Sequence, residues 1–175
     1  MTSATADSPL VIKGWSIFAH PQFLDTFESL VAQVERLRAK DPQGYTAKNL
    51  TKRLAATVRL AFEVIPQDPT HPEYRQGATL GDEYKHWFRA KFFQQYRLFF
   101  RYHRESRIII YAWVNDEDTT RAYESASDAY RTFRRMLKSG SPPDDWNQLL
   151  REAKAHNKPT RAARDSKSLM RRTDT

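Results

Sequence analysis

Residues 84–114 constrain the fold more than any other part of the chain. They read YKHWFRAKFFQQYRLFFRYHRESRIIIYAWV, which is three runs of aromatic and β-branched residues separated by polar breaks. The breaks fall at residues 94–95 and at residues 104–106. Runs of this length and composition, joined by breaks this short, predict a three-stranded antiparallel meander.

The two faces of this meander differ in chemistry, because side chains alternate between faces along a strand. The apolar face is expected to carry Phe88, Ala90, Phe92, Tyr96, Leu98, Phe100 and Tyr102. The opposite face is expected to carry Lys85, Trp87, Arg89, Lys91, Arg97, Phe99, Arg101 and His103. The alternation therefore predicts one apolar face and one basic face with interleaved aromatic rings.

The positive charge of the chain is concentrated on the same stretch. The 175 residues carry 29 Lys or Arg against 21 Asp or Glu, a formal net charge of +8. Between residues 84 and 111, seven Lys or Arg are balanced by Glu105 alone, and a second basic excess follows residue 156. Such a surface favours an anionic partner, either a nucleic acid or an acidic protein.

Composition excludes several other kinds of site. The chain has no cysteine, so it has no disulfide framework, thiolate metal site or cysteine nucleophile. No apolar run approaches the roughly 20 residues that span a bilayer. The first ten residues lack the basic and apolar regions of a secretory signal. We therefore expect a cytoplasmic protein without membrane contact.

The remaining patterns predict helices on either side of the meander. Residues 11–19 read as a first strand, and His20 is expected to cap the helix that follows. The expected helices cover residues 21–40, 46–64, 127–138 and 142–156. The length fits one domain, which we place at residues 11–156. A disordered start at residues 1–10 and a flexible basic tail at residues 157–175 flank it.

Five segments resemble one family of bacterial toxins. They read GWSIFAHPQF from residue 14, WFRAKF from residue 87, QYRLFFRY from residue 95, WVNDEDTTRAY from residue 113 and SDAYRTFRRMLKSGSPPDDW from residue 127. Together with the order β-α-α-β-β-β-α, they resemble the YhaV-type toxins, which belong to the RelE-like ribonuclease toxins of toxin–antitoxin modules. The resemblance covers residues 11–156.

This resemblance implies a fold and a function. The implied fold is α+β and RelE-like, an antiparallel sheet with a two-helix hairpin on one face and C-terminal helices. The implied function is the toxin of a type II toxin–antitoxin system. It would cleave mRNA on the ribosome by attack of a 2′-hydroxyl, without metal or other cofactor, and so inhibit translation. The implied partner is a PrlF-type antitoxin, through which alone the toxin would contact operator DNA.

The candidate catalytic residues are Arg89, Lys91, Arg97, Glu117 and Tyr123. A metal-free ribonuclease must stabilise charge on a pentacovalent phosphate with fixed cations, for which a planar guanidinium is well suited. Arg89 matches the Arg of the family's W-x-R-x-K-F motif, Arg97 the Arg of its YR motif, and Tyr123 its tyrosine after the fourth strand. RelE itself carries a basic residue where this chain has Glu117, which shifts the expected catalysis towards the second and third of the four strands, and above all to Arg89.

Several assignments stay open in the sequence. The general base is expected among Asp116, Glu117, His86 and His103. The residues expected to contact RNA are Lys85, Trp87, Phe99, Arg101, Arg107, Tyr111 and Arg121. Trp87 and Trp113 fit either stacking on RNA or packing beneath a C-terminal helix. Two other functions fit the basic face: an inhibitor that binds RNA or the ribosome without cleavage, and a DNA-binding regulator, although no helix-turn-helix pattern is present.

Overall fold

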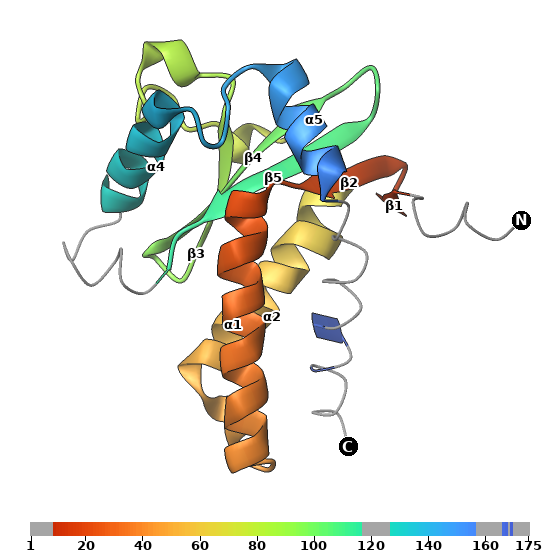
Figure 1. Ribbon diagram of the computed structural model, residues 1–175, viewed down its shortest axis with the longest axis vertical. Helices are drawn as coiled ribbons and strands as arrows, with labels where there is room; N and C mark the ends of the chain where they lie inside the picture. The colour runs from red at the N-terminus through yellow and green to blue at the C-terminus, as the bar shows by residue number, and fades with distance from the viewer. Residues whose placement is uncertain (1–8, 117–126, 157–165, 168, 170–175) are drawn as a thin grey trace, which may run out of the picture.

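The molecule is built around a five-stranded sheet, which Figure 1 shows. The computed structural model describes residues 9–116, 127–156, 166–167 and 169. The spatial order of the strands is β1-β2-β5-β4-β3. Their bounds are Leu10–Ile12 for β1, Trp15–Ala19 for β2, Phe88–Phe92 for β3, Tyr96–His103 for β4 and Ile108–Val114 for β5. The predicted meander is confirmed, because β3, β4 and β5 pair antiparallel in that order.

The sheet is mixed, which corrects the prediction of a purely antiparallel one. β2 pairs parallel with β5. Parallel neighbours need a long crossover, and the two helices after β2 provide part of it. The predicted single strand at residues 11–19 is also wrong, because it folds into the β1–β2 hairpin. Its turn places Lys13 at φ 53° and Gly14 at φ 84°, the positive angles that a two-residue hairpin turn requires.

Two helices cover one face of the sheet, as predicted (Figure 1). α1 spans Pro21–Lys40, and the side chain of His20 caps it by accepting from Gln22 N. α2 spans Asn49–Arg59 and continues as a π-helical turn over Leu60–Val64. The second helix begins later than expected, because Tyr45–Ala47 forms a 3₁₀ turn before it. The core beneath these helices includes Phe23, Phe27, Leu54, Phe62, Phe100 and Tyr111.

Two further helices cover the opposite face. α4 spans Ser127–Ser139 and α5 spans Trp146–Ala155, with Asp145 as its cap. Buried on this side are Phe18, Trp87, Phe99, Ile110, Trp113, Phe133 and Leu149. The rings of Phe99 and Phe133 stack at 4.2 Å. The sequence predicted an exposed basic face here, and the structure shows a second core instead. The apolar stripe of α4 needs a surface to bury itself against, and this face of the sheet is that surface.

A β-bulge in β5 decides which residues reach each core. Phe99 pairs with Trp113 and Phe100 pairs with Tyr111, so Ala112 is the extra residue. As a result Ala112 and Trp113 both belong to the core beneath α4 and α5, while Tyr111 and Val114 belong to the core beneath α1 and α2. Strict alternation would have placed Trp113 with Tyr111.

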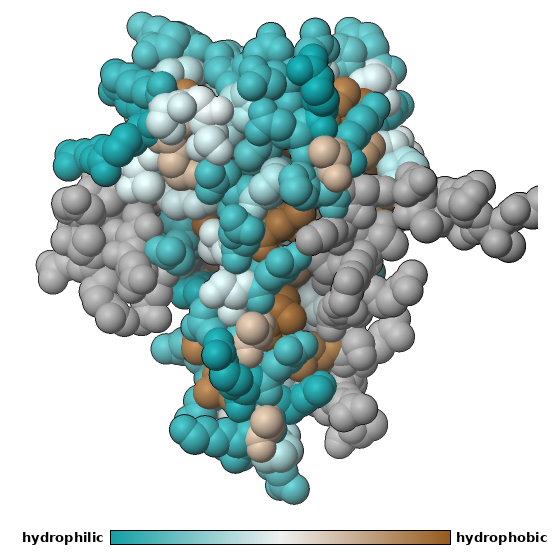
Figure 2. All heavy atoms as spheres, viewed as in Figure 1, coloured by the Kyte–Doolittle hydropathy of each residue, from teal (hydrophilic) through white to brown (hydrophobic). Residues whose placement is uncertain are grey.

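The remaining described segments are short and irregular. The connection between α2 and β3 includes 3₁₀ turns at Ile65–Gln67, Pro72–Tyr74 and Asp82–Tyr84. From the expected tail, Leu169 is buried, and its carbonyl accepts a 3.0 Å hydrogen bond from the hydroxyl of Tyr45. None of the described helices is long and apolar enough to cross a membrane. In the view of Figure 2, apolar residues gather in the lower half, over the α1–α2 pair.

Candidate active site

Two arginines of adjacent strands converge on one tyrosine hydroxyl. Arg89 of β3 donates from Nε to the hydroxyl of Tyr130 at 2.8 Å, and Arg97 of β4 donates from Nε to the same oxygen at 3.1 Å. Tyr130 reaches them from α4, where Ala129, Tyr130, Phe133 and Leu137 form the buried stripe. The position of α4 on the sheet therefore fixes both guanidinium groups.

Backbone carbonyls hold each guanidinium from a second side. Arg89 donates from Nη1 to the carbonyl of Glu73 at 2.7 Å. Arg97 donates from Nη1 to the carbonyls of Gln94 and Tyr96, at 2.7 and 2.9 Å. Within the described parts of the chain, these bonds leave the Nη2 group of each arginine without a partner. Two rigidly held Nη2 groups are suited to bind the oxygens of a phosphate.

Burial makes this pair of cations unusual. Arg89 is 8% exposed and Arg97 is 7% exposed. Among the described residues, no Asp or Glu forms an ion pair with either one. Taking a charge out of water without a counterion costs free energy, which an anionic ligand recovers when it binds. Lys91 lies directly opposite Arg97 in the β3–β4 pairing and is exposed, so a third cation borders the site.

Asn115 joins the end of β5 to this cluster. Its side chain accepts from the backbone N of Arg97 at 2.7 Å and donates to the carbonyl of Gln95 at 3.0 Å. The half-buried Asp116 follows it. Three predicted site residues, Glu117, Arg121 and Tyr123, lie outside the described residues. No group of three or more His, Asp or Glu is placed to hold a metal ion within the described ranges.

Arg101 belongs to a second cluster on the same face of the sheet. Its guanidinium lies over the rings of Trp87 and Trp146, 5.3 Å from each centroid, and donates to the carbonyl of Asp144 at 2.6 Å. Burial lowers the pKa of Arg101, against the opposing effect of Asp144 and Asp145. Trp87 donates from its indole to Asp144 Oδ1 at 2.7 Å. Of the two readings left open for Trp87, the structure supports packing beneath a C-terminal helix, because its side chain is 0% exposed. Arg101 is half-buried beside it, and its contact with RNA stays a prediction.

The two candidate histidines lie in this second cluster. His86 contacts Asp144 Oδ1 through Nε2 at 2.6 Å, and the ring of His103 stacks on Trp146 at 5.7 Å. His103 is six residues beyond Arg97 on one strand, which separates them by roughly 20 Å. Of the general-base candidates that the structure describes, it therefore favours Asp116 over His103, because His103 lies far from the paired arginines.

Two other predicted RNA contacts are buried. Phe99 and Tyr111 are both 0% exposed. Phe99 packs against Tyr130 and Phe133, whereas the hydroxyl of Tyr111 donates to the carbonyl of Ala61. Burial raises the pKa of Tyr111 well above its usual value. The predicted contact of these two residues with RNA is incompatible with this conformation, because helices cover both faces of the sheet.

Lys85 and Arg107 remain accessible. Lys85 is exposed and pairs with Asp82 at 3.3 Å. Arg107 is exposed in the turn between β4 and β5, and its guanidinium lies 5.3 Å from the ring centroid of Trp15. Their roles in RNA binding stay predictions.

Sequence reasoning missed the role of Tyr130. The signal was present, because Tyr130 shares the helical stripe of Ala129, Phe133 and Leu137, which had to face the basic side of the sheet. A polar hydroxyl in an apolar stripe needs a buried partner. Arg89 and Arg97 on that side of the sheet are the two partners.

The class of the protein follows from comparison with known families. Residues 17–154 match a family model described as "Toxin with endonuclease activity, of toxin-antitoxin system". The protein is therefore an endonuclease toxin with an antitoxin partner, which confirms the class of the first of the three functions expected from the sequence. More narrowly, the chain belongs to the YhaV toxin family.

Close relatives support the same assignment. The ribonuclease toxin YhaV of Escherichia coli strain K12 is 46% identical over 148 residues, which cover 83% of this chain and 96% of the relative. Toxin YhaV of E. coli O157:H7 shows the same identity and coverage. Toxin YhaV of E. coli O6:H1 is 45% identical over the same length. No solved structure gives a significant match.

Proposed function

We propose that the protein cleaves RNA at the paired arginines, by attack of a 2′-hydroxyl on the adjacent phosphorus. The observation that carries this proposal is the convergence of Arg89 and Arg97 on the hydroxyl of Tyr130, both buried and both with a free Nη2 group among the described contacts. A relative that is 46% identical is named a ribonuclease, which supports RNA as the substrate.

The reaction needs charge stabilisation and two proton transfers. The 2′-oxygen forms a bond to phosphorus while the bond to the 5′-oxygen breaks, leaving a 2′,3′-cyclic phosphate and a 5′-hydroxyl. Fixed guanidinium groups stabilise the extra negative charge of the pentacovalent phosphate. Lys91 attracts the scissile phosphate from solvent. A base removes the 2′-proton and an acid protonates the 5′-oxygen; Asp116, Glu117 and Tyr123 are the candidates beside or beyond the end of β5.

The first test removes one guanidinium. Arg89→Ala should lower RNA cleavage by roughly 10²–10³-fold, as the loss of one fixed oxyanion donor does in other enzymes. Arg89→Lys, which keeps the charge but loses the planar fork, should also be strongly impaired. Cleavage of a labelled oligoribonucleotide measures the activity. Circular dichroism and antitoxin affinity show whether each variant is folded.

Arg36→Ala is the matched control, because Arg36 is an exposed cation of α1 on the opposite face. It should cleave like the wild type. Full activity of a folded Arg89→Ala protein would remove Arg89 from the mechanism. Cleavage should also persist in EDTA, and complete loss there would replace the proposed metal-free reaction with a metal-dependent one.

We further infer a RelE-like fold, a PrlF-type antitoxin and a cytoplasmic site of action. The meander, the helical pair on one face and the α+β composition support the fold. The net charge of +8 supports cleavage of mRNA on the ribosome and an acidic antitoxin segment over the basic site. Operator DNA would be contacted through the antitoxin. Ribosome profiling after toxin induction tests the cleavage of mRNA on the ribosome. Co-purification with the product of the adjacent gene tests the identity of the antitoxin.

A further inference from the structure

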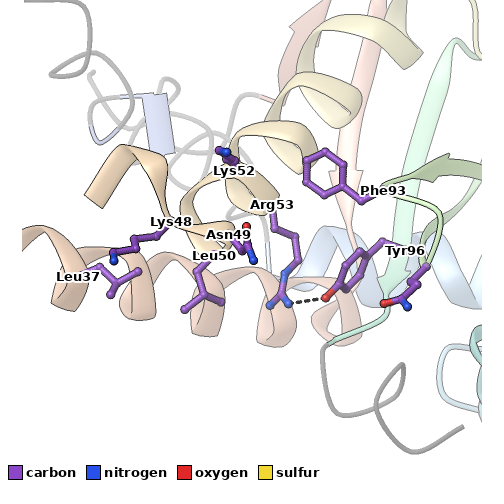
Figure 3. Close-up of a pocket in the computed structure, with 9 residues that line it drawn as sticks. Leu37, Lys48, Asn49, Leu50, Lys52, Arg53, Phe93 and Tyr96 are labelled. Carbon is purple, nitrogen blue, oxygen red and sulfur yellow. Dashed lines mark hydrogen bonds between the residues drawn. The ribbon is translucent and has the colours of Figure 1, made fainter. Parts of the chain in front are cut away.

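A cavity of about 630 Å³ lies on the other side of the β3–β4 turn from the paired arginines. Its walls come from the end of α1, the first turn of α2 and the β3–β4 turn (Figure 3). The lining residues are Leu37, Lys48, Asn49, Leu50, Lys52, Arg53, Phe93, Gln95 and Tyr96. A volume of this size is typical of a small-molecule or nucleotide site.

Three cations line this cavity, and one of them is buried. Arg53 is 8% exposed and donates from Nη1 to the hydroxyl of Tyr96 at 2.9 Å. That bond uses one of the five N–H donors of a guanidinium, and no carboxylate pairs with Arg53 among the described residues. Lys48 and Lys52 also line the cavity, and both are exposed (Figure 3). The first turn of α2 carries no acidic residue, so its N-terminal dipole adds to the positive potential.

Two aromatic rings complete the site. Phe93 is 53% exposed, one of two large apolar side chains described as exposed. Phe93 and Gln94 have φ of 48° and 62°, a left-handed conformation that is unfavourable for a bulky residue. The ring of Tyr96 is fixed by stacking on Phe92 at 5.4 Å. The exposed ring of Phe93 provides a surface on which a base can stack. The ring of Tyr96 instead holds the guanidinium of Arg53, which lies over it at 5.0 Å from the centroid.

The cavity and the paired arginines share one structural element. Arg97 donates to the carbonyls of Gln94 and Tyr96, so the turn that presents Phe93 is tied to a catalytic candidate. Because side chains alternate along β4, the ring of Tyr96 and the guanidinium of Arg97 lie on opposite faces of the sheet. A strand of RNA that crosses the turn would meet both sites within neighbouring nucleotides.

We propose that this cavity binds one nucleotide of single-stranded RNA next to the cleaved bond. The base stacks on Phe93, and a phosphate binds Arg53, Lys48 and Lys52. The side-chain amides of Asn49 and Gln95 can both donate to and accept from the edge of the base. This inference rests on the proposed RNA cleavage, because it assigns the cavity to the same substrate.

The test separates binding from cleavage. The probe is a short, fluorescein-labelled oligoribonucleotide of mixed sequence, 2′-O-methylated so that no 2′-hydroxyl can attack. Fluorescence anisotropy should show that Phe93→Ala binds it roughly five- to hundredfold more weakly than the wild type, the loss expected for one stacked base. Lys52→Ala should reduce the slope of log affinity against log salt by roughly 0.7, the value for one lost single-strand phosphate contact.

Matched controls remove an exposed apolar residue and an exposed lysine elsewhere. Val11→Ala, at the other exposed apolar residue, and Lys154→Ala, on α5, should bind like the wild type. Wild-type affinity of Phe93→Ala overturns the proposal. So does a loss of antitoxin affinity without a loss of RNA affinity, because it makes this cavity an antitoxin surface. If Phe93→Ala binds the probe more weakly but the wild type does not cut its unmethylated form, the proposed cleavage fails and the cavity is left as an RNA-binding site alone.

Discussion

The two faces of the sheet come from the same strands and yet differ in chemistry. Beneath α1 and α2, the core is apolar and aromatic, and its buried hydroxyl at Tyr111 bonds to a backbone carbonyl. Beneath α4 and α5, the core contains Arg89, Arg97 and the half-buried Arg101 in addition to aromatic rings. Apart from Arg53, which lines the cavity beside α2, the first face has the composition of a core that only stabilises. The second contains charges that a purely stabilising core would leave out.

The difference shows how the fold can bury cations without losing its core. Each arginine of the second face donates to a backbone carbonyl. Arg97 also lies beside the ring of Tyr130, and Arg101 lies beside the rings of Trp87 and Trp146. These contacts replace part of the lost hydration. Stability should therefore depend on both faces, whereas the cleavage step should depend on the second.

The largest expected effect is a loss of stability from either core. Phe99 and Phe100 are adjacent on β4, both 0% exposed, and face opposite sides. Phe100→Ala and Phe99→Ala should each lower the free energy of unfolding by about 3–5 kcal/mol. Urea unfolding measures this free energy.

The milder Phe→Leu pair separates the faces, because Phe99 supports Tyr130 and Phe100 does not. Only Phe99→Leu should reduce cleavage per folded molecule. Equal activity of the two leucine variants would contradict a division of roles between the faces.

An intermediate effect is expected from removing one hydroxyl on each face. Tyr130→Phe removes the shared acceptor of Arg89 and Arg97, and Tyr111→Phe removes a buried donor on the first face. Each should cost about 1–2 kcal/mol of stability. Only Tyr130→Phe should lower kcat, by roughly tenfold or more, because its arginines lose their position while remaining charged.

A positioning role for Tyr130 makes a further distinction. Substrate affinity at low salt should change little in Tyr130→Phe, since all cations remain. Single-turnover cleavage measured against RNA concentration separates the substrate affinity from the maximal cleavage rate. A weakened affinity with an unchanged maximal rate would make Tyr130 a binding residue instead.

The contrast between the faces also marks what the sequence could predict. Alternation along residues 84–103 correctly separated Phe100 from Phe99 and grouped Arg89 with Arg97. It could not show that the second face is covered. Which surface a helix packs on depends on the docking of α4, and no spacing within the strands encodes that.

Local irregularities of the sheet could not be predicted from the sequence either. The bulge that turns Trp113 away from Tyr111 depends on a two-to-one pairing between strands, and the parallel pairing of β2 depends on how the chain returns from α2. The cavity beside Arg53 joins residues more than forty positions apart, such as Arg53 and Tyr96. Neither part of that site has a motif of its own.

The smallest expected effect concerns His20, which joins the two faces. Its Nδ1 accepts from the backbone N of Gln22 at the start of α1, and its Nε2 bonds to Glu152 of α5 at 3.0 Å. Burial lowers the pKa of His20, opposed by Glu152 and Asp25 and assisted by the nearby His156. The unfolded chain therefore takes up a proton at this residue more readily than the folded one. Stability is fully present above the ordinary histidine pKa of about 6.5 and should fall as the pH drops through the lowered value.

Urea unfolding between pH 7.5 and about pH 5 measures this dependence. His20→Asn keeps a side chain that caps helices well but does not titrate there, so its stability should vary less with pH than that of the wild type. His156→Gln is the control for the neighbouring histidine. Its plot of the free energy of unfolding against pH should keep most of the wild-type slope. An unchanged slope in His20→Asn would assign the acid sensitivity to other groups. A reduced slope would mean that acid weakens the cap of α1, because a protonated Nδ1 of His20 can no longer accept from Gln22 N.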